Sequence, residues 1–271
     1  MRILLSLLLA CLPVQMALAA PKAEPWPRWE RHDAASTRQL DHSAWDEFLQ
    51  RYVRPAPDGL HRLAYGAVTP PARAQLQAYL QQLQAVPVSQ LNRAEQRAYW
   101  INLYNAQTVE TVLAHYPVAS ILKINTSPGL LARGPWGDRA LRVEGERLSL
   151  DDIEHRILRP VWRDPLIHYG VNCASVGCPN LAARAYTAAN SAALLEAGAR
   201  DFINHPRGAR VREGRLEVSS LYVWFKADFG GDDAGVIAHL RRYAAPALAA
   251  RLDGIGRISG HDYDWSLNDT P

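Results

Sequence analysis

The sequence predicts an α+β fold, in the form of a predominantly helical single domain with short antiparallel hairpins. Three observations predict it. Segments with apolar residues at helical spacing dominate the chain, strand-like segments are short and pair locally, and strands and helices do not alternate regularly. The hydrophobic content of 48% supports a packed core, and no repeat or linker divides the chain, so we expect residues 41–271 to form one domain.

The first 20 residues have the pattern of a secretory signal peptide. Arg2 precedes an apolar run over residues 3–12, and small residues end the segment before Pro21. Pro13 interrupts a run already shorter than the roughly 20 residues of a membrane span, so no transmembrane segment is predicted. We therefore expect an exported, periplasmic protein; the alternative is a lipid anchor on Cys11.

The first half of the mature chain is predicted to be an arm followed by helices. Residues 21–40 are rich in proline, tryptophan and charge without periodicity, which predicts an extended N-terminal arm. Helices are expected over residues 41–49, 73–83 and 92–115. The last is the strongest prediction, because Asn92 begins it with a capping-box-like pattern and Tyr116-Pro117 ends it.

The second half combines hairpins, helices and one isolated strand. Glu144-Gly145 and Glu213-Gly214 are turn signals inside alternating segments, which predicts hairpins over residues 140–148 and 211–219. Helices are also expected over residues 149–159, 187–203 and 233–243. A single strand is expected over residues 166–171.

Charge and motif content exclude several classes of function. The net charge is +3 with both signs interspersed, which argues against a nucleic-acid-binding surface. The chain has no Walker loop or dinucleotide fingerprint, and Asp228-Phe-Gly230 lacks the other kinase motifs. A structural zinc would need a second cysteine pair. We therefore expect no cofactor and no metal, and a partner that is a small-molecule, peptide or cell-envelope ligand of unknown identity.

Two amides interrupt the apolar face of the 92–115 helix. Asn102 and Asn105 are three residues apart and share this face with Val109 and Val112. A buried amide without partners costs about 1–3 kcal/mol. These side chains therefore either clamp the backbone of a neighbouring loop, or one of them orients a catalytic histidine or donates to an oxyanion.

A carboxylate lies in the apolar face of the 149–159 helix. Glu154 falls among Leu150, Ile153 and Ile157, and His155 lies just off that face. Such a carboxylate must be paired, or burial raises its pKa. Glu154 is therefore either the partner of an arginine, or a general acid or base, or the group that orients a histidine.

Residues 167–179 bring histidine, asparagine and two cysteines into one short segment. On a strand, His168 and Asn172 share one face, and five extended residues span about 16 Å. His168 and Cys173 therefore meet only if the chain turns near Asn172. Otherwise a thiolate at Cys173 needs a histidine from elsewhere, and the candidates are His155, His205 and His261.

The two cysteines left after signal cleavage allow three interpretations. Cys173 and Cys178 form a disulfide in an oxidising compartment, or Cys173 is a nucleophile, or the two bind a structural zinc, for which a second cysteine pair is missing. Separately, Pro179 suits the first position of a helix, so Cys178 could cap that helix, which would lower the pKa of its thiol. A nucleophilic cysteine needs a base and an orienting amide or carboxylate, and all of these residue types occur in the chain.

Five segments resemble the signature blocks of the DUF547 family, in the same order along residues 41–268. The blocks are residues 98–106, 149–155, 167–179, 224–229 and 263–268. The resemblance implies that Trp100, Asn102, Asn105, Glu154, His155, His168 and Cys173 match family positions. The family has no established activity, so the resemblance implies no reaction.

The leading hypothesis is a thiol-dependent hydrolase or acyltransferase of the papain or transglutaminase type. Cys173 would be the nucleophile, His168 or His155 the base, and Glu154 or Asn102 the orienting group. The hypothesis requires an imidazole within about 2.6–3.2 Å of Cys173 or a helix end at that residue. The alternative is a non-catalytic envelope-binding module, in which a Cys173–Cys178 disulfide shapes a cleft formed with Trp100, Asn102, Asn105 and His168. Asn172 and Ser175 are further candidate binding residues.

Overall fold

The computed structural model describes residues 21–129 and 132–271, and it confirms a single-domain α+β fold. The predicted signal peptide over residues 1–20, and with it the Cys11 lipid site, lies outside the described residues. Within the described part of the chain, no helix has the length and apolar character needed to cross a membrane.

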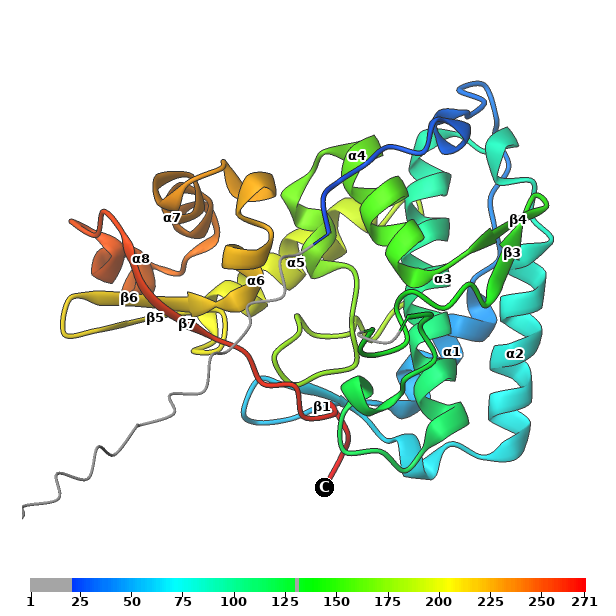
Figure 1. The fold of residues 1–271 in the computed structure, drawn as a ribbon, viewed down its shortest axis with the longest axis horizontal. Helices are drawn as coiled ribbons and strands as arrows, with labels where there is room; N and C mark the ends of the chain where they lie inside the picture. The colour runs from blue at the N-terminus through cyan, green and yellow to red at the C-terminus, as the bar shows by residue number, and fades with distance from the viewer. Residues whose placement is uncertain (1–20, 130–131) are drawn as a thin grey trace, which may run out of the picture.

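Three helices form the larger part of the molecule, which Figure 1 shows on the right. They are α1 (Ser43–Tyr52), α2 (Pro70–Gln84) and α3 (Arg93–His115). Asn92 caps α3 by accepting a hydrogen bond of 3.0 Å from the Glu95 amide, as its sequence predicts. Because α3 is buried on nearly every side, it is the centre of this core, which also contains Trp45, Leu49, Leu76, Leu83, Ile153 and Ile157.

Both predicted hairpins are confirmed. β3 (Leu141–Val143) pairs with β4 (Glu146–Leu148), and β5 (Ala209–Arg212) pairs with β6 (Arg215–Ser219), each antiparallel. Two pairings were not predicted. These are the small hairpin of β1 (Val53–Pro55) with β2 (His61–Leu63), and the parallel addition of β7 (Ile258–Asp262) to β6.

The smaller part of the molecule is built on the three-stranded sheet of β5, β6 and β7. Figure 1 shows it on the opposite side from α1 to α3, with α5 between the two parts. Its helices are α5 (Ser191–Asn204), α6 (Ser220–Trp224), α7 (Asp233–Tyr243) and α8 (Pro246–Leu252). A second apolar cluster holds them together, including Tyr169, Phe202, Tyr222, Phe229 and Leu240.

Two predicted elements are wrong in type or extent. The expected strand over residues 166–171 is a 3-10 helix, Pro165–Tyr169, which Asp164 caps by accepting a hydrogen bond from the Leu166 amide. Its last three side chains are all buried, which a strand with one exposed face would not allow. The helix expected from residue 187 begins at Ser191, because Thr187 and Asn190 bond to each other in a capping turn before it.

The segments around the 149–159 helix also differ from expectation. Most of that helix is a π-helix, Asp152–Leu158, which continues into α4 (Arg159–Trp162). The N-terminal arm is not simply extended, because it forms a 3-10 turn, Pro27–Glu30, whose Trp29 is 2% exposed. The arm also pairs its backbone with the π-helix, through a bond of 3.1 Å from the Glu24 amide to the His155 carbonyl.

Candidate functional site

The candidate site begins with a tight turn that presents Cys173. The Asn172 side chain accepts a hydrogen bond of 2.9 Å from the Ala174 amide, and Ala174 has a φ of 58°, in the left-handed region. A residue other than glycine adopts this region at a cost of about 1–2 kcal/mol, and such residues cluster at functional sites. No helix follows Pro179, so the predicted cap at Cys178 is wrong.

The C-terminal segment holds this turn in place. The amides of Val176 and Gly177 donate to the carbonyls of Ser266 and Asp264, each over 2.8 Å. A short antiparallel bridge joins Ser175 to the same segment. The cysteine turn is therefore braced by backbone bonds to residues some 90 positions later in the chain.

Replacing Gly177 by alanine is expected to destabilise the protein by about 1–3 kcal/mol. A Cβ there would lie 2.9 Å from the backbone nitrogen and oxygen of Asp264 and from the Tyr263 ring, so the C-terminal segment would have to move. Urea unfolding measures the effect. Gly256→Ala is the matched control, because a Cβ at Gly256 meets nothing within 4 Å. Equal stability of the two variants would contradict the described contact.

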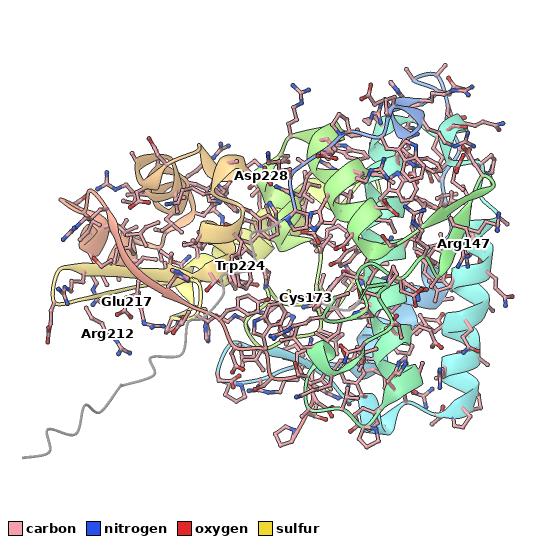
Figure 2. The ribbon with its side chains drawn as sticks, viewed as in Figure 1. Arg147, Cys173, Arg212, Glu217, Trp224 and Asp228 are labelled. Atoms are coloured by element: carbon pink, nitrogen blue, oxygen red, sulfur yellow. The ribbon has the colours of Figure 1, made fainter. Side chains whose placement is uncertain are left out.

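Both cysteines are thiols in this structure, and they are in contact. The Cys173 Sγ atom lies 2.8 Å from the Cys178 Sγ, 3.2 Å from the Ser175 Oγ and 3.0 Å from the Tyr263 hydroxyl. Cys178 is 5% exposed, whereas Cys173 is only half-buried. Figure 2 shows Cys173 between the helical part and the sheet part of the molecule.

These contacts favour a thiolate at Cys173. Burial raises the pKa of the Cys173 thiol, but hydrogen bonds from Cys178, Ser175 and Tyr263 outweigh burial and lower it. Burial and the neighbouring sulfur hold the pKa of Cys178 well above its ordinary value. After the first deprotonation the two sulfurs share the one proton that remains, so this step belongs to the pair, and its charge rests on Cys173, the less buried sulfur.

Glu154 and His155 project from the π-helix. A π-helix is rare and is frequent at functional sites, because its wider turn changes the direction of its side chains. Glu154 is 8% exposed and accepts a hydrogen bond of 3.0 Å from the Tyr104 hydroxyl of α3. Its other oxygen lies 3.8 Å from the His155 Nδ1 and 3.9 Å from the His168 Nδ1. Glu154 therefore lies between two imidazoles and a phenol.

Glu154 does not pair with an arginine in the described structure; a different carboxylate does. Asp228 accepts hydrogen bonds from the Arg159 Nε at 2.6 Å and the His168 Nε2 at 2.8 Å. His168 also stacks on Phe225, with ring centroids 4.5 Å apart. Sequence reasoning missed Asp228 as a site residue, although it lies in one of the blocks that resemble the family.

The imidazole and the thiol expected to form a dyad do not meet. No histidine within residues 21–129 and 132–271 is a hydrogen-bond partner of Cys173, and no helix ends there. The influence of Glu154 on the thiol is electrostatic, since its negative charge acts to raise the pKa of Cys173. His205 and His261 bond elsewhere, to the Asp58 carbonyl and to Ser220.

The amides on α3 bind the backbone of two loops. Asn102 donates to the carbonyl of Tyr186 and accepts from its amide. Asn105 in the same way donates to the Gly170 carbonyl and accepts from the Asn172 amide, over 2.8 Å each. Asn105 thus holds the start of the cysteine turn, which is the clamping role that the sequence left open.

The other residues considered for binding differ in accessibility. Trp100 is 1% exposed and packs edge-on against Trp29, so it supports the core. Asn172 is buried and donates to the Pro179 carbonyl. Ser175 lies beside the thiol, where its hydroxyl is also 3.0 Å from the Tyr263 hydroxyl.

Four half-buried aromatic side chains, which we call the aromatic cluster, pack together, and one of them, Tyr263, contacts Cys173. The cluster consists of Trp136, Trp224, Tyr263 and Trp265, and the Tyr263 and Trp265 rings are 4.6 Å apart. Sequence reasoning missed Tyr263, which contacts the thiol, although the closing block of the family resemblance contains it.

A second carboxylate, Asp151, lies near the other ring nitrogen of His155, and we call Glu154, His155 and Asp151 the Glu154 group. Asp151 is 3.6 Å from the His155 Nε2, and burial together with the charges of Glu154 and Asp152 raises its pKa to about 7. The protonated carboxyl of Asp151 therefore stabilises the fold fully below about pH 4. This stabilisation is lost as the pH rises to 7, because the folded protein must then release the proton.

Asp151→Asn is expected to gain stability relative to the native chain between pH 4 and 7 and to keep that gain above pH 7, because asparagine stays uncharged. Urea unfolding across this range measures the difference. Asp46→Asn is the control and should lose stability instead of gaining it. The reason is that hydrogen bonds from Arg184 and Ala185 outweigh burial and lower the pKa of Asp46, so the charged form of Asp46 stabilises the fold. A pH-independent difference for Asp151→Asn would contradict the raised pKa.

Comparison with known proteins gives a family but no activity. Residues 88–203 match the model of a family described as "Protein of unknown function, DUF547". This region contains α3, the π-helix and the cysteine turn, so the matched region includes most of the candidate site. No curated protein and no solved structure gives a match.

Proposed function

Through residues 88–203 the chain belongs to the DUF547 family, whose function is unknown, and we propose from the site itself that it is a thiol-dependent hydrolase or acyltransferase. One observation carries the proposal. A half-buried thiol, Cys173, has three side-chain hydrogen-bond partners that stabilise its thiolate, and the charge of a carboxylate that lies beside two imidazoles, Glu154, acts on it.

Cys173 is the nucleophile in this proposal. Its thiolate attacks the carbonyl carbon of an acyl group, and the leaving group departs with a proton to leave a thioester on the sulfur. Water or another acceptor then attacks the thioester and releases the thiol. The described residues provide neither the imidazole contact nor the helix end that the sequence-based hypothesis required at Cys173. The proposal therefore replaces them: hydrogen bonds from Tyr263, Ser175 and Cys178 stabilise the thiolate in place of a histidine.

A histidine next to Glu154 delivers the proton that the leaving group takes up. His155 is assigned this role rather than His168, because His155 lies next to the half-exposed Asp151, while His168 is 2% exposed and bonded to Asp228. Burial lowers the pKa of His155, so its imidazole is neutral near pH 7 and can exchange a proton with Glu154 or Asp151.

Acetylation by p-nitrophenyl acetate tests the proposal. The reduced full-length chain, carrying Cys11→Ala in every variant so that only Cys173 and Cys178 remain, is expected to gain one acetyl group on Cys173. Intact-mass spectrometry detects the group, and neutral hydroxylamine removes it. Cys173→Ala should gain none. Cys178→Ala removes one of the three hydrogen bonds to the thiolate, so it should still be acetylated, but more slowly than the native chain. A hydroxylamine-sensitive acetyl adduct that persists in Cys173→Ala, or the lack of any such adduct on the native chain, would contradict the proposal.

A second candidate is the non-catalytic envelope-binding module, and the aromatic cluster favours it. Half-buried tryptophan and tyrosine rings grouped on one surface are common in binding sites. A ligand that quenches tryptophan fluorescence and binds Cys173→Ser as tightly as the native chain would support this candidate over the enzyme.

We propose for either candidate that residues 1–20 direct export to the periplasm. The support is the basic residue, apolar run and small residues at the start of the chain. N-terminal sequencing of the chain recovered from a cell-envelope fraction tests it, and a retained Met1 would contradict cleavage.

A further inference from the structure

We propose that Cys173 and Cys178 form a peroxide-responsive pair, in which a peroxide oxidises Cys173 and Cys178 then closes a disulfide that reversibly blocks acyl transfer. The loss of acyl transfer rests on the function proposed above. The thiol chemistry itself does not, because it depends only on the two sulfur atoms and their surroundings.

The two sulfurs differ in access. Cys173 is half-buried and its sulfur has three hydrogen-bond partners that favour the thiolate, the form of cysteine that reacts with peroxides. Cys178 is 5% exposed, and burial keeps it protonated. A peroxide from solution therefore reaches Cys173 first, while Cys178 stays reduced beside it.

The turn keeps the second sulfur in place for the reaction. The two Sγ atoms are 2.8 Å apart, and the backbone bonds from Val176 and Gly177 to the C-terminal segment hold the turn between them. The Cys173 amide also donates to the Cys178 Sγ over 2.9 Å, which stabilises negative charge on that sulfur as it attacks. Little rearrangement separates the thiol pair from the disulfide.

Peroxide converts the two thiols into a disulfide in two steps. The Cys173 thiolate attacks one peroxide oxygen, the O–O bond breaks, and a proton completes the alcohol or water that leaves, so that sulfenic acid forms on Cys173. The Cys178 thiol then attacks that sulfur and loses its proton. The hydroxyl of the sulfenic acid takes up this proton and leaves as water, and the S–S bond forms.

The disulfide has two consequences for the site. Cys173 no longer carries a thiolate, so no thioester can form until a thiol reductant restores it. Cys178 also protects Cys173, because a sulfenic acid without a neighbouring thiol proceeds to sulfinic acid, which thiol reductants do not reverse.

Intact-mass spectrometry of the full-length chain tests the pair, with Cys11→Ala in every variant so that only Cys173 and Cys178 can react. Fully reduced protein receives one equivalent of hydrogen peroxide, then iodoacetamide, with or without prior dithiothreitol. The native chain should lose two hydrogens, resist alkylation at Cys173, and recover fully with dithiothreitol. Cys178→Ser should gain oxygen on Cys173 and recover only in small part. Cys173→Ser should stay unmodified at its buried Cys178. Cys178→Ala repeats the second arm in case serine disturbs the packing.

The outcomes separate this proposal from the proposed function. If the native chain stays open to alkylation after peroxide, or if both Cys178 variants recover as fully as the native chain, the redox pair is overturned. If the disulfide forms but p-nitrophenyl acetate leaves no acetyl group on reduced Cys173, the proposed enzyme fails and the redox pair stands. If the thioester forms and peroxide has no effect, only the redox pair fails.

Discussion

Asp228→Ala is expected to lower the free energy of unfolding by about 3–5 kcal/mol, the cost of breaking a buried ion pair by removing one partner. One oxygen of Asp228 accepts hydrogen bonds from both Arg159 and His168, whose side chains are 5% and 2% exposed. Without the carboxylate, a buried guanidinium and a buried imidazole lose their acceptor together. Urea unfolding at pH 7 measures the loss.

A surface ion pair provides the matched control for Asp228. Glu217 accepts a bond of 2.6 Å from Arg210, but the two side chains are 36% and 26% exposed, so Glu217→Ala should cost at most about 1 kcal/mol. Figure 2 shows Glu217 on the sheet and Asp228 near the middle of the molecule. Similar losses for both variants would show that Asp228 is not a buried partner of Arg159 and His168.

Glu154→Gln is expected to slow acyl transfer, by up to the roughly 10²–10⁴-fold that a general acid contributes, because His155 loses the carboxylate with which it exchanges its proton. The same substitution should speed alkylation of Cys173 at low pH, because Glu154 raises the pKa of that thiol by its negative charge. Glutamine keeps an oxygen that accepts the Tyr104 hydroxyl, so the fold is preserved. The measurements are p-nitrophenyl acetate turnover and the iodoacetamide reaction rate against pH.

The opposite signs of these two effects make the test specific to Glu154. Glu95→Gln is the control, because Glu95 is a carboxylate of α3 that is 4% exposed and bonded to the Leu40 amide, apart from the thiol. It should change neither rate by more than about twofold, as expected for a group outside the site. Parallel losses of turnover and alkylation in Glu154→Gln would indicate general damage rather than proton transfer.

Elements with strong local signals were predicted well from the sequence. The capping pattern at Asn92 and the stop at Tyr116 locate α3, and residues 233–243 coincide with α7. The Glu-Gly turns likewise locate both predicted hairpins. These signals depend on hydrogen bonds between residues within a few positions of one another, so the sequence alone contains them.

Elements that depend on distant packing were not predicted. Residues 165–169 have the apolar character of a strand, but Tyr169 packs against the sheet part while Ile167 packs in the helical core, which the 3-10 turn permits. The π-helix and the parallel strand β7 have no local signature that separates them from an α-helix or a loop.

The sequence by itself determined the class of fold and most of the helices and hairpins, and it singled out Glu154, His155, His168 and Cys173 as candidate site residues. Only the tertiary structure decided how these residues combine. It separated Cys173 from the histidines, placed Tyr263 on the thiol and joined His168 to Asp228. The reason is physical: residue type and local spacing are written along the chain, whereas contacts between residues 60 or 90 positions apart depend on how the whole core packs.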